Sequence, residues 1–329
     1  MRNWTNESVE KAVGVLGRCG SVSEAAERLG VSGAALSAAF ERARERGLDC
    51  GSPVEHVGAG RVGKAGSVVN GGATDPAGAR EIERVFFIPD VHVPNHHKQA
   101  WNVCLNAIRA WRPHRVVILG DFADDECVSS HSKGPDRNRL LKNEIVAVRR
   151  ELDRLQDACR DAGVGRVDYI EGNHCDRLSR YLQDRAPELY GLVSMPELMR
   201  IADRGWHWTP YKSSLRVGKL VVTHDFGFAG ANAATQNLMA CGHSCITGHT
   251  HRASVVYQGH TDGQRHVSIT AGWLGDAKEA AKYKHLDRGL REWQHGIVTA
   301  EMTADGLAWC NFHPIIKGKM VLHGQVVRG

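Results

Sequence analysis

Short apolar runs of strand length recur along the chain from position 84 onward. Five of them cover residues 85–88, 116–119, 167–170, 220–223 and 245–247. Between the second and third runs, apolar side chains repeat at helical spacing over residues 141–155, which predicts one long amphipathic helix. Strand-length runs that alternate with helical periodicity are typical of α/β proteins.

The C-terminal part of the chain has a different pattern of apolar and polar residues. Residues 267–270, 297–300 and 308–312 are rich in the residue types that strands favour and carry little helical periodicity. We therefore expect two sheets packed face to face. The predicted fold is a four-layer α/β/β/α sandwich of two mixed sheets flanked by helices.

The first 46 residues are predicted to form three short helices. Ser21 and Glu24 have the spacing of a capping box, and Gly30 is placed to end the second helix. The pattern is similar to a small all-α helix-turn-helix. A helix bundle for protein contacts is the alternative, because acidic and basic residues balance over residues 1–50 and the side chains of residues 33–35 are too short to reach base edges. The glycine-rich segment 47–83 is expected to be a flexible linker, and residues 84–329 to form one domain.

Composition narrows the class of protein. The chain has 329 residues, of which 42% are hydrophobic and 24% charged, as in globular proteins. No apolar run is long enough for a membrane span, so no membrane partner is expected. Nine cysteines without CxxC pairs favour a reducing compartment, and we expect a cytoplasmic location in a bacterial cell or a phage-infected host. The net charge of +5 permits a phosphate-bearing partner. The oligomeric state is left open.

Potential metal ligands follow each of the five central strands. They are Asp90, His92, Asp121, Asn173, His174, His224, His249 and His251. Open α/β sheets place their sites at the carboxyl ends of strands, so these side chains are expected to converge. Carboxylate, amide and imidazole donors together suit divalent ions such as Mn²⁺, Fe²⁺ or Zn²⁺.

The ordered set Asp-x-His, Gly-Asp, Gly-Asn-His, His and Gly-His-x-His resembles the calcineurin-like metallophosphoesterase superfamily over residues 84–275. The run from Gly172 to Leu182 is similar to phage-encoded members. The resemblance implies that residues 84–329 form a metallophosphoesterase domain. It implies two divalent metal ions, with Mn²⁺ expected and Fe²⁺, Zn²⁺ or Ni²⁺ as alternatives.

The resemblance also implies roles for individual residues. Metal one would be held by Asp90, His92 and His251, and metal two by Asn173, His224 and His249, with Asp121 bridging the two. A metal-activated hydroxide would attack phosphorus in line, and His174, free of metal, would act as the acid. Asp124 would hydrogen-bond His174 and orient it.

Two positions depart from the family's pattern. Asp125 stands where the phosphoprotein-phosphatase branch has arginine, which removes a bidentate phosphate clamp. Cys175 stands where other branches have an acidic residue after Gly-Asn-His. Arg177, in the turn after His174, is a candidate substrate-binding residue, and a salt-bridged surface arginine is the alternative.

The substrate is expected to be a phosphate ester. A phosphodiesterase or nuclease acting on nucleic acid (DNA or RNA) or nucleotides is favoured, because basic residues outnumber acidic ones in 84–329 and residues 275–293 mix basic and aromatic side chains. A phosphomonoesterase or a cyclic-nucleotide phosphodiesterase is the near alternative. A DNA-binding regulator with an inactive phosphoesterase domain is the alternative from another class.

Overall fold

The computed structural model describes residues 28, 29, 31, 68–69, 81–130, 140–259, 263–282 and 292–329. The chain divides into two units, Met1–Val62 and Gly63–Gly329. Apart from the helical residues Arg28 and Leu29 and the neighbouring Val31, the predicted helix-turn-helix module lies outside the described residues and stays a prediction. The predicted linker lies mostly outside them too, although strand β1 (Val68–Val69) and the start of β2 fall within its bounds.

One six-stranded sheet has the order β12-β11-β2-β3-β4-β5. Its strands are β2 (Ile82–Ile88), β3 (Arg115–Ile118), β4 (Arg166–Ile170), β5 (His207–Thr209), β11 (Gly296–Thr303) and β12 (Ala308–Pro314). Strands β2 to β5 pair in parallel, whereas β11 is antiparallel to both β2 and β12. The sheet is therefore mixed, and its parallel part sends the carboxyl ends of β2, β3, β4 and β5 towards one edge.

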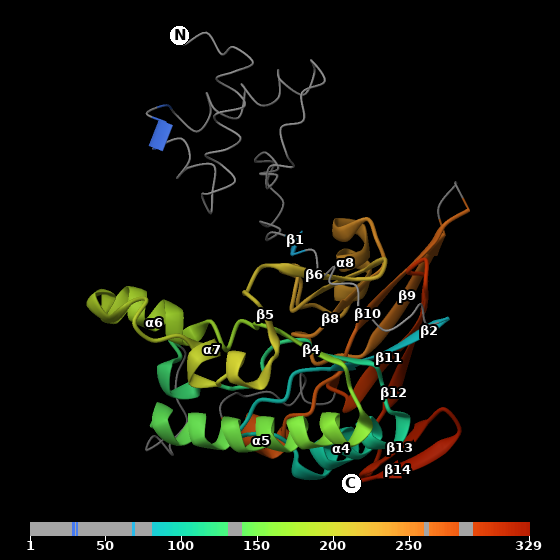
Figure 1. The fold of residues 1–329 in the computed structure, drawn as a ribbon, viewed down its shortest axis with the longest axis horizontal. Helices are drawn as coiled ribbons and strands as arrows, with labels where there is room; N and C mark the ends of the chain where they lie inside the picture. The colour runs from blue at the N-terminus through green and yellow to red at the C-terminus, as the bar shows by residue number, and fades with distance from the viewer. Residues whose placement is uncertain are drawn as a thin grey trace. The chain divides into compact units, whose positions relative to one another are not determined.

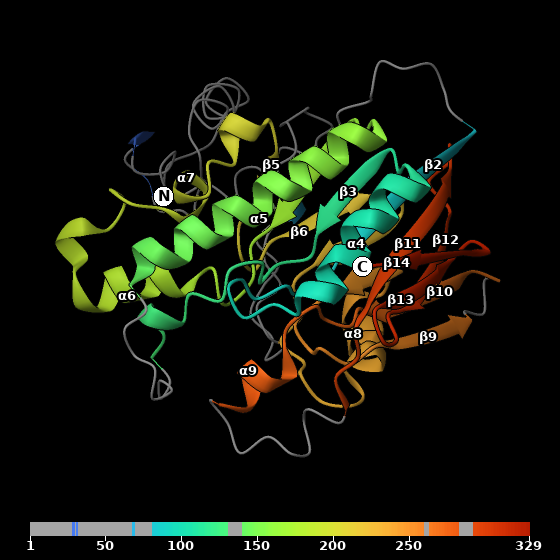
Figure 2. The same cartoon turned by 90° about the horizontal axis from the view of Figure 1, so that it is seen from below.

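Two long helices, α4 (Lys98–Trp111) and α5 (Leu141–Ala162), pack against each other and cover the outer face of this sheet (Figures 1 and 2). Helix α5 is the long amphipathic helix that the sequence predicts over residues 141–155. It ends where Gly163 adopts the left-handed conformation that glycine tolerates best. The apolar faces of both helices join Phe86 and Ile88 of β2 in one core.

The second six-stranded sheet has the order β1-β6-β7-β8-β10-β9 and is also mixed. It contains β6 (Ser214–Val217), β7 (Leu220–Thr223), β8 (Cys245–Thr247), β9 (Ser254–Gly259) and β10 (Arg265–Thr270). Helix α8 (Ala233–Cys241) packs against β8, β9 and β10. A second core fills the space between the two sheets.

Strand β2 shows how the two cores are built from one sequence run. Its side chains alternate, so that Val85 and Phe87 enter the core between the sheets while Phe86 and Ile88 enter the core beneath the helices. All four are fully buried, which explains why the strand reads as a continuous apolar run. The expectation of a mixed α/β fold with two mixed sheets and helices is confirmed.

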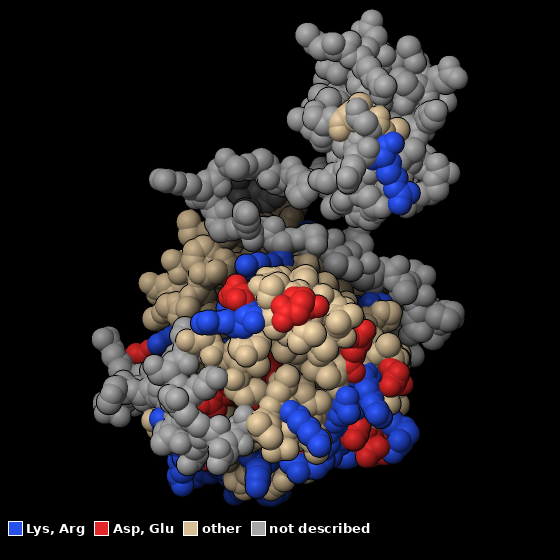
Figure 3. Space-filling model, turned by 90° about the vertical axis from the view of Figure 1, so that its left-hand side faces the viewer, with Lys and Arg blue, Asp and Glu red and all other residues tan. Residues whose placement is uncertain are grey.

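Smaller elements complete the described part of the chain. They are the helices α6 (Arg177–Arg185), α7 (Met195–Leu198) and α9 (Ala277–Ala281), the 3₁₀ turns η1 (Glu126–Val128), η2 (Pro187–Leu189) and η3 (Ala202–Arg204), and the hairpin β13 (Lys319–Leu322) with β14 (Gln325–Arg328). Basic and acidic side chains both occur on the face viewed from the α6 side, and basic ones gather along its lower edge (Figure 3). Within the described residues, no helix combines the length and the apolar character that crossing a membrane requires.

Candidate metal centre

The potential ligands lie on five loops that leave the carboxyl ends of strands from both sheets. Asp90, Asp121 and Asn173 follow β2, β3 and β4 of the first sheet. His224 and His249 follow β7 and β8 of the second sheet. The site therefore lies where corresponding edges of the two packed sheets meet, which brings together residues far apart in the sequence.

Glycine makes the close approach of these loops possible. A Cβ atom at Gly172 would collide with the carboxylate of Asp121, and one at Gly248 would collide with that of Asp90. Gly120 lies against His224 and also has a φ of +107°, which L side chains rarely adopt. At Gly172 and Gly248, which have no positive φ, glycine is required because it leaves space for a neighbouring ligand.

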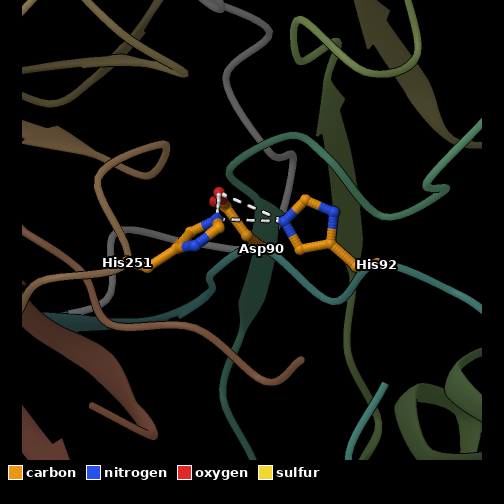
Figure 4. Close-up of side chains that lie close together, drawn as sticks. All are labelled: Asp90, His92 and His251. Carbon is orange, nitrogen blue, oxygen red and sulfur yellow. Dashed lines mark hydrogen bonds and ion pairs between the residues drawn. The ribbon is translucent and has the colours of Figure 1, made fainter. Parts of the chain in front are cut away.

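The first ligand group consists of Asp90, His92 and His251 (Figure 4). His251 Nε2 lies 3.0 Å from Asp90 Oδ2 and 3.0 Å from His92 Nε2. His92 Nε2 is 3.9 Å from the same carboxylate oxygen. The other contacts of Asp90 fix its orientation, because the backbone N–H of His249 donates to both of its oxygens. Three donors thus converge on one small volume.

The second ligand group consists of Asp121, His224 and His249. His224 Nε2 lies 3.2 Å from Asp121 Oδ2, and its Nδ1 is held 2.8 Å from the carbonyl oxygen of Leu119. Asn173 Oδ1 completes the group, at 2.9 Å from His224 Nε2 and 2.8 Å from His249 Nδ1. The backbone N–H of His174 donates to Asp121 Oδ1 over 2.8 Å.

The donor chemistry of both groups fits divalent cations. Asp90 and Asp121 are buried carboxylates, and buried charges are normally paired or coordinate metals. Imidazole nitrogens meet a carboxylate in both groups, and an amide oxygen joins them in the second, which is a mixture that borderline divalent ions accept. His92, Asp121, His249 and His251 also have positive φ angles, and backbone strain of this kind gathers at functional sites.

The electrostatics of the site also favour cations. Burial alone would raise the pKa of Asp121, but the charges of His224 and His174 hold that pKa well below its ordinary value. Burial opposes protonation of His224, yet Asp121 raises the pKa of this imidazole to about 10. The negative field that stabilises a proton on His224 would equally stabilise a metal ion.

His174 lies beside both groups and is oriented by two neighbours. Its Nδ1 is 2.8 Å from Asp124 Oδ1, and its Nε2 is 2.9 Å from the guanidinium of Arg177. Because the guanidinium can only donate, Nε2 is the accepting nitrogen and Nδ1 donates to Asp124. Asn95, which sequence reasoning did not single out, donates to the second oxygen of Asp124 and so fixes that carboxylate.

Arg177 also donates to the backbone oxygen of Asp124 over 2.7 Å, and its side chain is only 13% exposed. It is therefore packed on the His174–Asp124 pair rather than solvated as a surface arginine. Its guanidinium reaches the nitrogen of His174 that would face a substrate. A role in substrate binding stays a prediction, and the structure places the residue where that role is feasible.

Both residues that depart from the family pattern, Asp125 and Cys175, are buried. Asp125 is fully buried, and neither of its carboxylate oxygens has a hydrogen-bond partner among the described residues. Burial raises the pKa of Asp125 well above its ordinary value. Cys175 is also fully buried, where its sulfur lies 3.3 Å from the hydroxyl of Tyr169. Both side chains thus belong to the protein interior.

Aromatic rings flank the two ligand groups, and one of them, Trp293, lies at the end of the basic and aromatic segment 275–293 that the sequence singled out. Trp273 stacks on His251 with ring centroids 4.9 Å apart, and Trp293 meets His251 edge-on at 4.4 Å. On the other side, Tyr211 lies 6.3 Å from the ring of His224. The places of Trp273 and Tyr211 beside the ligand groups depend on tertiary contacts, and the sequence did not single out either residue.

Comparisons with known proteins identify one similar phage protein and distantly similar phosphatase structures. No family model matches the chain. It is 28% identical over 271 residues to Gene 54 protein of Mycobacterium phage L5, across 74% of this chain and 98% of that protein. It is similar to a dimetal phosphatase from Danio rerio, with a TM-score of 0.36 and 12% identity over 76% of this chain and 99% of the other. A phosphatase structure from Mycoplasma pneumoniae gives a TM-score of 0.34 and 12% identity over 71% and 93% of the two chains. The similarity to a phage protein agrees with the resemblance to phage-encoded sequences. What the site can do chemically follows from its own side chains.

Proposed function

We propose that this protein is a metal-dependent phosphoesterase with a two-metal centre. One observation carries the proposal: two adjacent groups of buried carboxylate and imidazole donors lie beside a histidine that is paired with its own aspartate. Asp90, His92 and His251 would hold one ion, and Asn173, His224 and His249 the other, with Asp121 between them. Two bound divalent ions would supply positive charge to the phosphoryl oxygens and lower the pKa of bound water.

The protein's own residues then position the ester and move one proton. His174 is held by Asp124 and lies beside the first ligand group, with ring centroids 4.6 Å from His92. In the hydrolytic complex His174 would be protonated on both nitrogens, so that Nε2 donates to the leaving oxygen while Nδ1 stays on Asp124. Arg177 would exchange its contact with His174 Nε2 for a phosphoryl oxygen, which a guanidinium binds well.

Within this class we favour a phosphodiesterase or nuclease acting on nucleic acid or nucleotides. The excess of basic side chains in residues 84–329 supports a polyanionic substrate. The buried Asp125 supports the exclusion of serine/threonine phosphatase activity, because no arginine clamp stands at that position. A phosphomonoesterase or cyclic-nucleotide phosphodiesterase is the alternative within the class. A DNA-binding regulator with an inactive domain is disfavoured, since both ligand groups and the His174–Asp124 pair are complete.

The proposal is tested by assaying the purified full chain with Mn²⁺ on bis(p-nitrophenyl) phosphate and on p-nitrophenyl phosphate. We expect metal-dependent hydrolysis, faster on the diester. Single-stranded and duplex DNA and RNA are then compared as substrates. Faster hydrolysis of the monoester would overturn the diesterase assignment, and metal-loaded protein that hydrolyses neither compound would overturn the enzyme.

A further inference from the structure

Three aromatic rings form one cluster at the edge of the first ligand group. His251 and Trp273 are nearly parallel, with an angle of 15° between their planes. Trp293 stands almost perpendicular to both, with ring centroids 4.4 Å from His251 and 4.7 Å from Trp273. Trp273 is buried, whereas Trp293 is partly exposed. Trp293 is thus a large aromatic ring in contact with a candidate metal ligand and with solvent.

Backbone hydrogen bonds fix Trp293 to the loop that carries His251. Gln294 N donates to the carbonyl oxygen of His251 over 3.1 Å, and Trp273 N donates to that of Gln294 over 2.9 Å. On the other side of Trp293, Glu292 accepts from Arg252 Nε over 2.7 Å. A rigid aromatic ring loses little conformational entropy when it contacts a ligand, which favours Trp293 as a binding surface.

Other groups around the centre are already engaged by protein partners. The ring of Tyr211, beside the second ligand group, is covered by Lys212, whose Nζ lies 5.5 Å from the ring centroid. The guanidinium of Arg252 is held by Glu292 and by the carbonyl oxygen of Ala229. Tyr211 and Trp293 are both partly exposed rings beside a candidate ligand, and Trp293 is the one that no cation among the described residues covers.

We propose that Trp293 is a stacking platform for the nucleobase of a nucleotide phosphoester bound at the metal centre. The inference rests on the proposed function and names the group that the enzyme recognises next to the scissile phosphate. Contact with His251 places Trp293 within the length of a nucleoside from a phosphate at the first ligand group. Stacking on a tryptophan accepts every base, because each base has a π face, so the platform selects nucleotides without selecting sequence.

The test uses two diesters with the same leaving group, thymidine 5′-(p-nitrophenyl phosphate) and methyl p-nitrophenyl phosphate. We expect Trp293→Leu to raise the KM for the thymidine ester about 10-fold, the effect of losing one modest stacking contact, with kcat retained. The KM for the methyl ester should not change, and Trp293→Phe should restore most of the affinity for the thymidine ester. Trp309→Leu is the matched control, since Trp309 is a 57% exposed tryptophan on β12.

Two outcomes would overturn the platform. If Trp293→Leu leaves the KM for the thymidine ester unchanged, Trp293 does not bind the base. If the KM rises equally for both esters, Trp293 contributes to binding the part that the two esters share and not the base. Metal content and thermal melting of each variant separate these results from loss of the site or of the fold. If the wild-type protein hydrolyses neither ester, the proposed function fails by itself. Calorimetric titration with thymidine 5′-phosphate in the presence of Mn²⁺ then decides, because equal affinity of wild type and Trp293→Leu overturns the stacking role.

Discussion

His92 Nε2 and His251 Nε2 lie 3.0 Å apart although their residues are separated by 159 positions in the chain. Two imidazole nitrogens come this close either by sharing a proton or by converging on a cation. The carboxylate of Asp90 lies beside both, which adds negative charge to the same volume. Burial lowers the pKa of His251 to about 4, so this imidazole is neutral near pH 7 and its lone pair is available to a metal ion.

Removing the metals is expected to destabilise the protein, because the site holds buried carboxylates that need positive charge. Cations present at 100 times their dissociation constant stabilise the folded state by about 2.7 kcal/mol per site. Dialysis against a chelator should therefore lower the midpoint of urea unfolding, and adding Mn²⁺ back should restore it.

His251→Ala serves as the specific variant for this effect. It should retain about one metal ion per chain by elemental analysis, because the second ligand group is left intact. His266→Ala, which changes an imidazole on β10 outside both groups, should bind two. Unfolding that is unaffected by chelator in wild-type protein would contradict the prediction.

His174→Ala should keep both metal ions and lose turnover. His174 contacts Asp124 and Arg177 through its two ring nitrogens, so its loss leaves all seven proposed ligands in place. General acid catalysis contributes about 10²- to 10⁴-fold, and kcat on the diester should fall within that range. Steady-state kinetics and elemental analysis of the same preparation check both statements.

Asp124→Asn tests the partner of His174 in the same way. The amide removes the negative charge from the carboxylate that His174 and Arg177 share. We expect a smaller loss of kcat than in His174→Ala, because the imidazole itself is retained. The role of His174 as the acid would be contradicted if His174→Ala kept the wild-type kcat, or if it lost both metal ions.

The sequence predicted the loops of the site better than the contacts around them. Strand runs followed by ligand-type residues were enough to place Asp90, Asp121 and Asn173 together, since the parallel strands β2, β3 and β4 end at one edge. The alternation of β2 between two cores is likewise a local consequence of strand geometry. The burial of Asp125 and the contact of Trp293 with His251 depend on the packing of distant segments, which leaves no periodic signal in a single sequence.

The close packing of the loops predicts an unusual sensitivity to alanine at Gly248. A Cβ atom there would collide with Asp90 Oδ1, so Gly248→Ala should displace that carboxylate and weaken the first metal site. Gly230→Ala is the matched control, because no atom lies within 4 Å of its added Cβ and its φ is not positive. We expect the Mn²⁺ affinity of Gly248→Ala to fall at least 10-fold, a range typical of disturbing the support of a ligand. Titration calorimetry should show no change for Gly230→Ala, and equal affinity in both variants would contradict the collision.

Glu144 on α5 should make stability fall as pH rises. Burial, reinforced by the charge of Asp124, raises its pKa from about 4.5 to about 7. The folded state therefore favours the protonated carboxyl, so the contribution of Glu144 to stability is complete below about pH 4.5 and is lost as pH rises through 7. Glu144→Gln keeps an acceptor for the backbone N–H of Glu126 and cannot ionise. Its advantage over wild type should be near zero at pH 4.5 and reach at most about 3 kcal/mol at pH 9. Urea unfolding at pH 4.5, 7 and 9 measures this difference, and an advantage that does not change with pH would show that Glu144 is not the titrating group.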